Sequence, residues 1–216
     1  MDIGCAIGSP LGWAGGMATN SFLIAKYHPH AVVTGADVDR EVIARNEELL
    51  REHPVRNLRF CHFDLLSPRG LLPQDVVVMS DVVGNRPGDF ELVRSAALVV
   101  RQGGHLVLHV PSRHPSERPP KPGDLPDILA NGYSEDELLF LLRASGASEI
   151  SFRRSFGPAA RLAGRIRSAL LRVSQLAGVI LFPVQLLLGV LDLLLPNRDG
   201  HGIIAVARIG GREGGA

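Results

Sequence analysis

The sequence has few of the residues that mark several classes of protein. Cys5 and Cys61 are its 2 cysteines, and they lack the spacing of a zinc site or a disulfide framework, which predicts buried thiols in a reducing compartment. The net charge is +1, and this balance argues against a nucleic-acid partner. The first residues lack the charged and apolar pattern of a secretory signal, so the expected location is the cytoplasm.

Several motifs of catalysis and metal binding are also missing. The sequence has no G-x-S-x-G elbow and no phosphate-binding loop that ends in lysine. His28 and His30 flank a proline, and His105 and His109 fall on one face of a strand, where we expect no cysteine or carboxylate beside them. We therefore predict no metal site.

What the sequence does contain is a regular alternation of apolar runs and helical patterns. Its 216 residues, of which 45% are hydrophobic, suffice for one domain with a substantial core. The runs that we expect to form buried strands lie at 31–37, 57–64, 75–81, 103–111 and 202–209. Helix-length segments separate them. This pattern predicts one α/β domain over residues 1–216, with a doubly wound and mostly parallel sheet.

The helical segments carry start and stop signals. Crossover helices are expected at 18–27, 39–53 and 89–101. Gly103 and Gly104 are expected to end the last of these. Ser134 and Glu137 have the spacing of a capping box, which predicts a helix that ends near Gly146 and is followed by a strand.

A helical, apolar insertion is predicted at 156–200, before the last strand. Arginines at helical spacing precede the run 176–196, which is the most apolar stretch of the chain. This run has the roughly 20 residues that a membrane span needs, but a span would separate the last strand from the sheet that it joins. We expect instead that the insertion is buried against the domain, forms a homodimer interface, or contacts the inner face of a membrane peripherally through 161–196.

A series of small residues follows the first acid of the chain. After Asp2 come Gly4, Ala6 and Gly8, at the point where a strand is expected to turn into a helix. Small residues there let a ligand approach the backbone, and the N–H groups of the helix start attract polar or anionic atoms. A tight turn that binds nothing would have the same pattern.

Further acids stand at the ends of the next predicted strands. Asp37 is placed to accept hydrogen bonds from ribose hydroxyls, although either it or Asp39 equally suits a helix N-cap. Asp64 is placed to accept from the amine of a purine, with Leu65 against the ring, and Asp81 ends the fourth strand. Open α/β sheets bind ligands at the carboxyl ends of their strands, so this shared placement predicts a ligand site.

Taken in order, these stretches resemble a known family. DIGCAIG, VVTGADVD, FCHFDLLS, DVVVMSDVVGN and VVRQGGHLVLHVP resemble the successive motifs of class I S-adenosylmethionine-dependent methyltransferases, particularly the bacterial small-molecule type. The resemblance covers about residues 1–111 and extends to GYSEDELLFLLRASGASEI. It implies a Rossmann-like sheet of seven strands with the last antiparallel, S-adenosylmethionine as cofactor, and methyl transfer to a small-molecule or lipid-linked, amphipathic acceptor.

The resemblance also implies residue roles. It places Asp2, Gly4, Ala6 and Gly8 at the methionine part of the cofactor, Asp37 and Val38 at the ribose, Asp64 and Leu65 at the adenine, and Ser80 with Asp81 between sulfonium and acceptor. An in-line methyl transfer needs no dedicated base. If the acceptor is a hydroxyl, Asp81, His109 and His114 are the candidates for a base, although each equally suits a structural role.

The sequence departs from the family pattern in its first half. Ala6 replaces the middle glycine of the first motif, residues 9–18 lengthen the first loop, and Gly84 and Asn85 stand where the family often has an acid and a histidine. The sequence also begins at the last turn of the first strand. We therefore expect an N-terminally truncated chain that binds the cofactor weakly.

Two other functions remain open from the residues. An NAD(P)-dependent Rossmann oxidoreductase also uses a glycine turn and an acid, but its fingerprint has a third glycine where this chain has Ser9. A non-catalytic, membrane-associated protein that keeps the methyltransferase fold would explain Ala6 and the basic, then apolar, insertion.

Overall fold

The computed structural model describes residues 1–4, 19–67, 72–83, 88–113, 132–155, 157 and 200–210. Its elements in chain order are β1 (Asp2–Ile3), α1 (Thr19–Tyr27), β2 (Val33–Asp37), α2 (Arg40–Glu52), β3 (Leu58–His62), β4 (Gln74–Ser80), α3 (Asp89–Val99), β5 (Val100–Pro111), α5 (Glu135–Ala144), β6 (Ala147–Ser155) and β7 (Gly202–Ile209). The predicted helical insertion lies outside the described residues except for Gly157 and Gly200.

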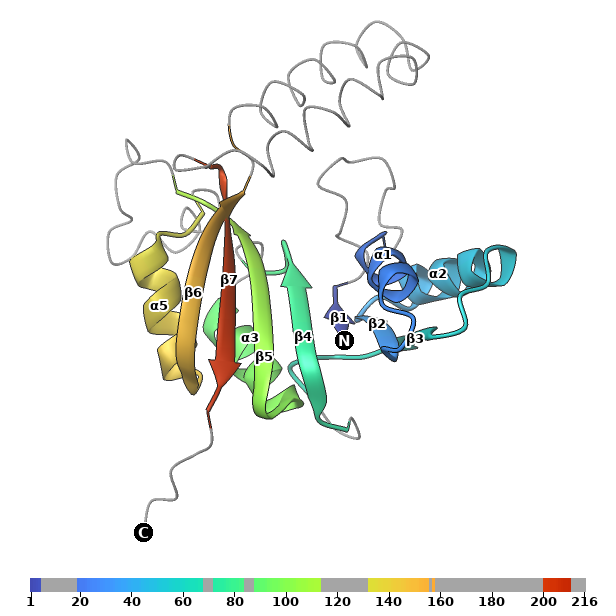
Figure 1. Ribbon diagram of the computed structural model, residues 1–216, viewed down its shortest axis with the longest axis horizontal. Helices are drawn as coiled ribbons and strands as arrows, with labels where there is room; N and C mark the ends of the chain where they lie inside the picture. Colours follow the sequence, from blue (N-terminus) through green and yellow to red (C-terminus); the bar gives the residue numbers. More distant parts are fainter. Residues whose placement is uncertain are drawn as a thin grey trace, which may run out of the picture.

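A seven-stranded mixed sheet forms the centre of the molecule (Figure 1). The strand order is β3-β2-β1-β4-β5-β7-β6, in which β1 to β5 pair in parallel. β7 pairs antiparallel with both of its neighbours, β5 and β6. The expected α/β architecture is therefore confirmed, and the reversed β7 makes the sheet mixed rather than wholly parallel.

The helices cover the sheet in two groups. α1 and α2 lie beside β2 and β3, whereas α3 and α5 lie beside β4 to β7 (Figure 1). Successive residues of a strand face opposite sides of a sheet. In β1, Ile3 belongs to the larger core together with Val93 of α3 and Leu138 of α5, whereas Asp2 bonds to Ser21 of α1. The two groups of helices therefore lie on opposite faces.

One side chain holds the end of α1 against the sheet. The amide nitrogen of Asn57 donates to the carbonyl oxygens of Ala25 (3.0 Å), His28 (3.1 Å) and Ala31 (2.9 Å). The last carbonyl oxygens of a helix have no N–H partner within the helix. The side-chain amide of Asn57 supplies hydrogen-bond donors at the end of α1. This contact fixes α1 over the half of the sheet that contains β1.

The start of β5 differs from the sequence prediction. The helix expected at 89–101 ends earlier, and β5 already begins at Val100, so the two glycines lie inside a strand. Gly103 has a φ of 77°, and the register between β4 and β5 shifts here. A β-carbon on Gly104 would lie 2.7 Å from the carbonyl oxygen of Asp75. The glycines therefore serve a bulge in which two backbones approach closely, not a helix end.

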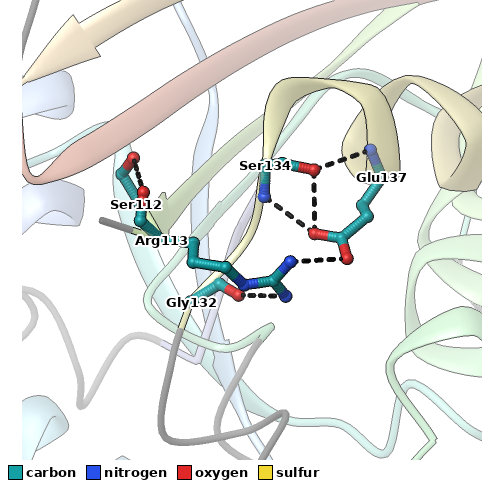
Figure 2. Close-up of polar contacts among 5 residues, drawn as sticks. All are labelled: Ser112, Arg113, Gly132, Ser134 and Glu137. Carbon is teal, nitrogen blue, oxygen red and sulfur yellow. Dashed lines mark hydrogen bonds and ion pairs between the residues drawn. The ribbon is translucent and has the colours of Figure 1, made fainter. Parts of the chain in front are cut away.

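The first turn of α5 is anchored to the end of β5 (Figure 2). Ser134 Oγ accepts from the Glu137 N–H at 3.3 Å, and the Glu137 carboxylate accepts from the Ser134 N–H at 2.8 Å, which confirms the predicted capping box. Arg113, just beyond β5, donates to Glu137 Oε1 at 2.8 Å and to the Gly132 carbonyl at 3.1 Å. The start of α5 is therefore held at the carboxyl edge of the sheet.

We predict that Glu137→Gln destabilises the protein in a pH-dependent way. Burial alone would raise the pKa of the Glu137 carboxyl, but hydrogen bonds from Ser134 and Arg113 outweigh it and hold the pKa below its usual value. The stabilisation is therefore present above the pKa of the unfolded chain and is lost as pH falls through the lowered pKa. The urea midpoint of the variant should fall at pH 7 and approach the wild-type midpoint below pH ~4.

Asp136→Asn is the matched control, because Asp136 lies exposed in the same helical turn. Its midpoint should stay close to that of the wild type. A loss for Glu137→Gln that is equal at both pH values would contradict the electrostatic explanation.

Candidate functional site at the carboxyl edge of the sheet

The central strand β1 begins with a buried carboxylate. Asp2 is 3% exposed, and its Oδ2 accepts a hydrogen bond from Ser21 Oγ at 2.6 Å. Burial raises the pKa of Asp2 to about 6 and the charge of Asp37 adds to this effect, while the Ser21 hydrogen bond and the Met1 ammonium oppose it. A carboxylate in this environment is stabilised in its ionised form by a nearby cation.

Ser21 is a site residue that the sequence analysis missed. Gly35 pairs with Asp2 in the ladder, and a β-carbon on Gly35 would lie 2.8 Å from Ser21 Oγ and 2.5 Å from the ring of Phe60. The missing side chain lets α1 pack directly on β2, which brings Ser21 to Asp2. The available signal was a glycine in the middle of a buried strand, which marks a close approach.

Gly4 turns the chain at the end of β1. Its φ of 71° is a conformation that glycine adopts freely, and its N–H donates to the Ala36 carbonyl at 2.8 Å. A β-carbon on Gly4 would collide with the side chain of Val82, which follows β4. The predicted small-residue turn thus exists at Gly4, whereas Ala6 and Gly8 lie outside the described residues.

At the end of β2, two acids divide the roles that the sequence left open. Asp39 is the N-cap of α2, and its Oδ1 accepts from the Glu41 N–H at 2.8 Å. Asp37 is the buried last residue of β2, and its Oδ1 accepts from the Asp39 N–H at 3.0 Å. Val38 lies exposed between them. Asp37 is therefore the acid that lies at the carboxyl end of β2, and Asp39 is the helix cap.

Asp64 follows β3 at the same edge. Its Oδ1 accepts from the Leu66 N–H at 3.0 Å, which closes a local turn. Leu65 is 5% exposed and belongs to the larger core, whereas Leu66 is 57% exposed. The expectation that Leu65 offers its side chain to a ligand ring is corrected, because this side chain points into the core and the apolar surface beside Asp64 belongs to Leu66.

Two of the three candidate bases meet at the ends of β4 and β5. Ser80, the last residue of β4, pairs in register with His109, and Asp81 follows with a φ of 56°. Asp81 Oδ1 lies 2.9 Å from His109 Nδ1, and His109 Nε2 lies 2.9 Å from the Oγ of Ser155 at the end of β6. The sequence analysis expected no carboxylate beside His109. This expectation was wrong, because the turn at Asp81 directs its carboxylate toward the neighbouring strand.

The third candidate base and two further features of the sequence are not tested or not found within the described residues. His114 lies outside the described residues. Within the described ranges, no group of three or more His, Cys, Asp or Glu side chains is arranged to hold a metal ion. Nor does any helix in these ranges have the length and hydropathy to cross a membrane; the apolar run 176–196 is not among them.

A hollow of about 560 Å³ lies at the other edge of the sheet. Its lining includes Leu98 at the end of α3, Val100 at the start of β5, Gly146 just before β6 and Gly210 just after β7. These residues are at the amino ends of the parallel strands, away from Asp2, Asp37 and Asp64. We therefore place the functional site by its carboxylates and not by this hollow.

The strand order bears on the choice between nucleotide-binding folds. A dinucleotide-binding Rossmann sheet has the parallel order 3-2-1-4-5-6. Here β7 is inserted antiparallel between β5 and β6. The sheet therefore argues against an NAD(P)-dependent oxidoreductase.

Comparison with known proteins identifies the fold. No protein-family model and no curated protein matches the sequence. Among solved structures, phosphoethanolamine N-methyltransferase 2 of Haemonchus contortus, bound to phosphomonomethylethanolamine and S-adenosylhomocysteine, matches 98% of this chain and 48% of its own at 14% identity and a TM-score of 0.62. YcgJ of Bacillus subtilis matches 97% of this chain and 91% of its own at 14% identity and a TM-score of 0.59.

The chain thus has the fold found in S-adenosylmethionine-dependent methyltransferases. It spans about half the length of the first matching structures, namely 45% of the methyltransferase domain of the citrinin polyketide synthase and 48% of the Haemonchus contortus enzyme. SpnF, a cyclase, has the same fold, with 18% identity over 97% of this chain and 73% of its own and a TM-score of 0.60. One fold therefore hosts different reactions, and the activity must be argued from the residues of the site.

We predict that Asp2→Asn stabilises the protein above pH 6. Because the folded pKa of Asp2 is raised to about 6, the wild type loses stability as pH rises from the unfolded pKa through 6. A shift of about two units corresponds to roughly 3 kcal/mol, which is the upper limit of the gain in the free energy of unfolding at pH 8. Urea denaturation at pH 4.5 and pH 8 measures it.

Asp39→Asn controls for the loss of a carboxylate, because asparagine caps a helix as well as aspartate does. It should shift stability by no more than a few tenths of a kcal/mol at either pH. A gain for Asp2→Asn that persists undiminished at pH 4.5 would contradict the raised pKa.

Proposed function

We propose that this protein transfers the methyl group of S-adenosylmethionine to a small-molecule or lipid-linked acceptor. The observation that supports this function best is the set of three carboxylates on adjacent strands, namely Asp2 in β1, Asp37 at the end of β2 and Asp64 after β3. The sheet order and the turn at Gly4 add to it.

The charge of the site fits this cofactor. S-adenosylmethionine carries a sulfonium and an ammonium group, and a buried carboxylate with a raised pKa, such as Asp2, gains from a cation beside it. Asp37 would hold the ribose hydroxyls, and Asp64 the amine of the adenine. The exposed side chains of Val38 and Leu66 would pack against the rings. When bound, the cofactor supplies an electrophilic methyl carbon.

The acceptor side would lie at the ends of β4 and β5, beside Asp81 and His109. A carboxylate only accepts hydrogen bonds, so Asp81 holds the proton of His109 on Nδ1 and leaves Nε2 basic. His109 would take the proton of a hydroxyl or amine acceptor. Since an in-line displacement owes much of its rate to positioning, loss of His109 should slow methyl transfer without abolishing it.

The amphipathic character of the acceptor is inferred from the insertion. Arginines followed by the apolar run 176–196 are typical of a segment that lies on an anionic membrane surface. We infer peripheral membrane contact through 161–196. Deletion of 176–196 should reduce co-sedimentation with vesicles that contain anionic lipid, and an unchanged bound fraction would remove the lipid-linked acceptor from the proposal.

Cofactor binding tests the methyltransferase proposal directly. Titration calorimetry should show binding of S-adenosylhomocysteine and no binding of NAD. Asp37→Asn should weaken the affinity at least about tenfold, since a lost hydrogen bond to a charged group costs about 1.5–3 kcal/mol. Asp75→Asn is the matched control. Asp75 is an exposed carboxylate at the start of β4, the end of the strand away from the site, where it pairs with Arg101 of β5, so its loss should leave the affinity unchanged.

The alternatives give different results in the same titration. Tight binding of NAD without a response to S-adenosylhomocysteine would support the oxidoreductase. Binding of neither ligand by a protein that floats with liposomes would support the non-catalytic, membrane-associated protein.

A further inference from the structure

The proposed methyl transfer uses Asp81 and His109 as a base, but the structure also connects this pair to a third side chain, Ser155, which methyl transfer does not need. Asp81 Oδ1 lies 2.9 Å from His109 Nδ1, and His109 Nε2 lies 2.9 Å from Ser155 Oγ. The order is carboxylate, imidazole, hydroxyl. Serine hydrolases use this order, in which the imidazole removes the proton of the serine and the carboxylate orients the ring.

The order also determines where the protons are. Because Asp81 accepts from Nδ1–H, the lone pair of the ring is on Nε2, and the Ser155 hydroxyl donates to it. Proton transfer from Ser155 would leave an imidazolium that the Asp81 carboxylate stabilises. Ser155 is therefore the hydroxyl whose proton His109 is placed to remove.

The cluster is held by regular elements and reaches the surface. Beside Ser155, Arg154 Nε donates to Glu135 Oε1 of α5 at 2.7 Å, and the Asp81 N–H donates to the His109 carbonyl at 2.9 Å. The side chain of His109 is 15% exposed and that of Asp81 is 32% exposed. Ser155 is also partly exposed. The hydroxyl is thus positioned by three strand ends and accessible to a substrate.

Apolar side chains share this face of the sheet. His109 pairs with Ile204 of β7, and Val107, two residues earlier on the same face, pairs with Val206. All three apolar side chains are partly exposed, and they lie on the face opposite the larger core. This surface suits the acyl group of an ester of an apolar acid.

We propose that Ser155 is an acyl-accepting nucleophile, activated by His109 and Asp81, that acts on esters of apolar acids. Ser155 Oγ attacks the ester carbonyl carbon while its proton passes to His109 Nε2. The bond to the leaving alcohol breaks, and the alcohol takes that proton. Water then attacks the acyl group and gives one proton through His109 back to Ser155, which releases the acid. The two proposed activities share His109 and Asp81, but no cofactor takes part in this one, so it is measured without S-adenosylmethionine.

An activated ester tests the nucleophile without knowledge of the natural substrate. Oxyanion stabilisation supplies much of the rate in serine hydrolases, so the measured quantity is stoichiometric acylation rather than turnover. The full chain is mixed with excess 4-nitrophenyl butyrate, release of 4-nitrophenolate is followed, and peptide mass spectrometry locates the butyryl group. We expect a burst of about one equivalent and a butyryl group on Ser155.

Variants separate a nucleophile from a structural hydroxyl. Ser155→Ala should lose the burst, whereas Ser151→Ala, at an exposed serine on the same face of β6, should keep it. Asp81→Asn should slow the burst by about 100-fold or more. Ser155→Cys keeps a nucleophile at the position and should retain labelling if the alanine variant fails to fold.

The contrary results are equally distinct. Absence of a burst from the folded wild type, or a butyryl group on residues other than Ser155, would overturn the proposal. In that case the cluster only joins three strand ends, and Ser155→Ala would alter the thermal midpoint alone. Binding of S-adenosylhomocysteine in the same preparation reports on methyl transfer independently.

Discussion

Burial of the Asp2 carboxylate in the central strand is the constraint on which the site depends. β1 is flanked by β2 and β4, and the ionised side chain has Ser21 Oγ as its hydrogen-bond donor. Ser21 reaches it only because Gly35 lets α1 approach the sheet closely. Because burial raises its pKa, the ionised group lowers the stability of the folded protein. Its presence is understandable if a cationic ligand completes the site.

The second half of the sheet depends on a different constraint, the reversal of β7. By separating β5 from β6, this strand sets the distance over which His109 reaches Ser155. Two ion pairs fix the first turn of α5 at the same end of the sheet. Arg113 binds Glu137, and Arg154 binds Glu135. The acids of β1 to β3 and the imidazole cluster of β4 to β6 thus occupy one edge and are positioned by separate interactions.

The sequence predicted the features that depend on neighbouring residues. The final strand at 202–209 is confirmed at both ends, and the Ser134–Glu137 capping box is confirmed because a helix cap involves residues three apart. The end of α3 was predicted wrongly. Gly103 and Gly104 have the composition of a helix stop, and only the contact of Gly104 with Asp75 shows that they serve a bulge.

The sequence by itself determined which strands form and which acids stand at their ends, because strand periodicity and local turns are encoded in adjacent residues. Only the tertiary structure decided which side chains meet. Leu65 points into the core and Leu66 out of it, Ser21 meets Asp2, and Asp81, His109 and Ser155 come together from three strands. These contacts depend on strand order, register and the close packing of α1, which join residues far apart in the chain and leave no periodic signal in it.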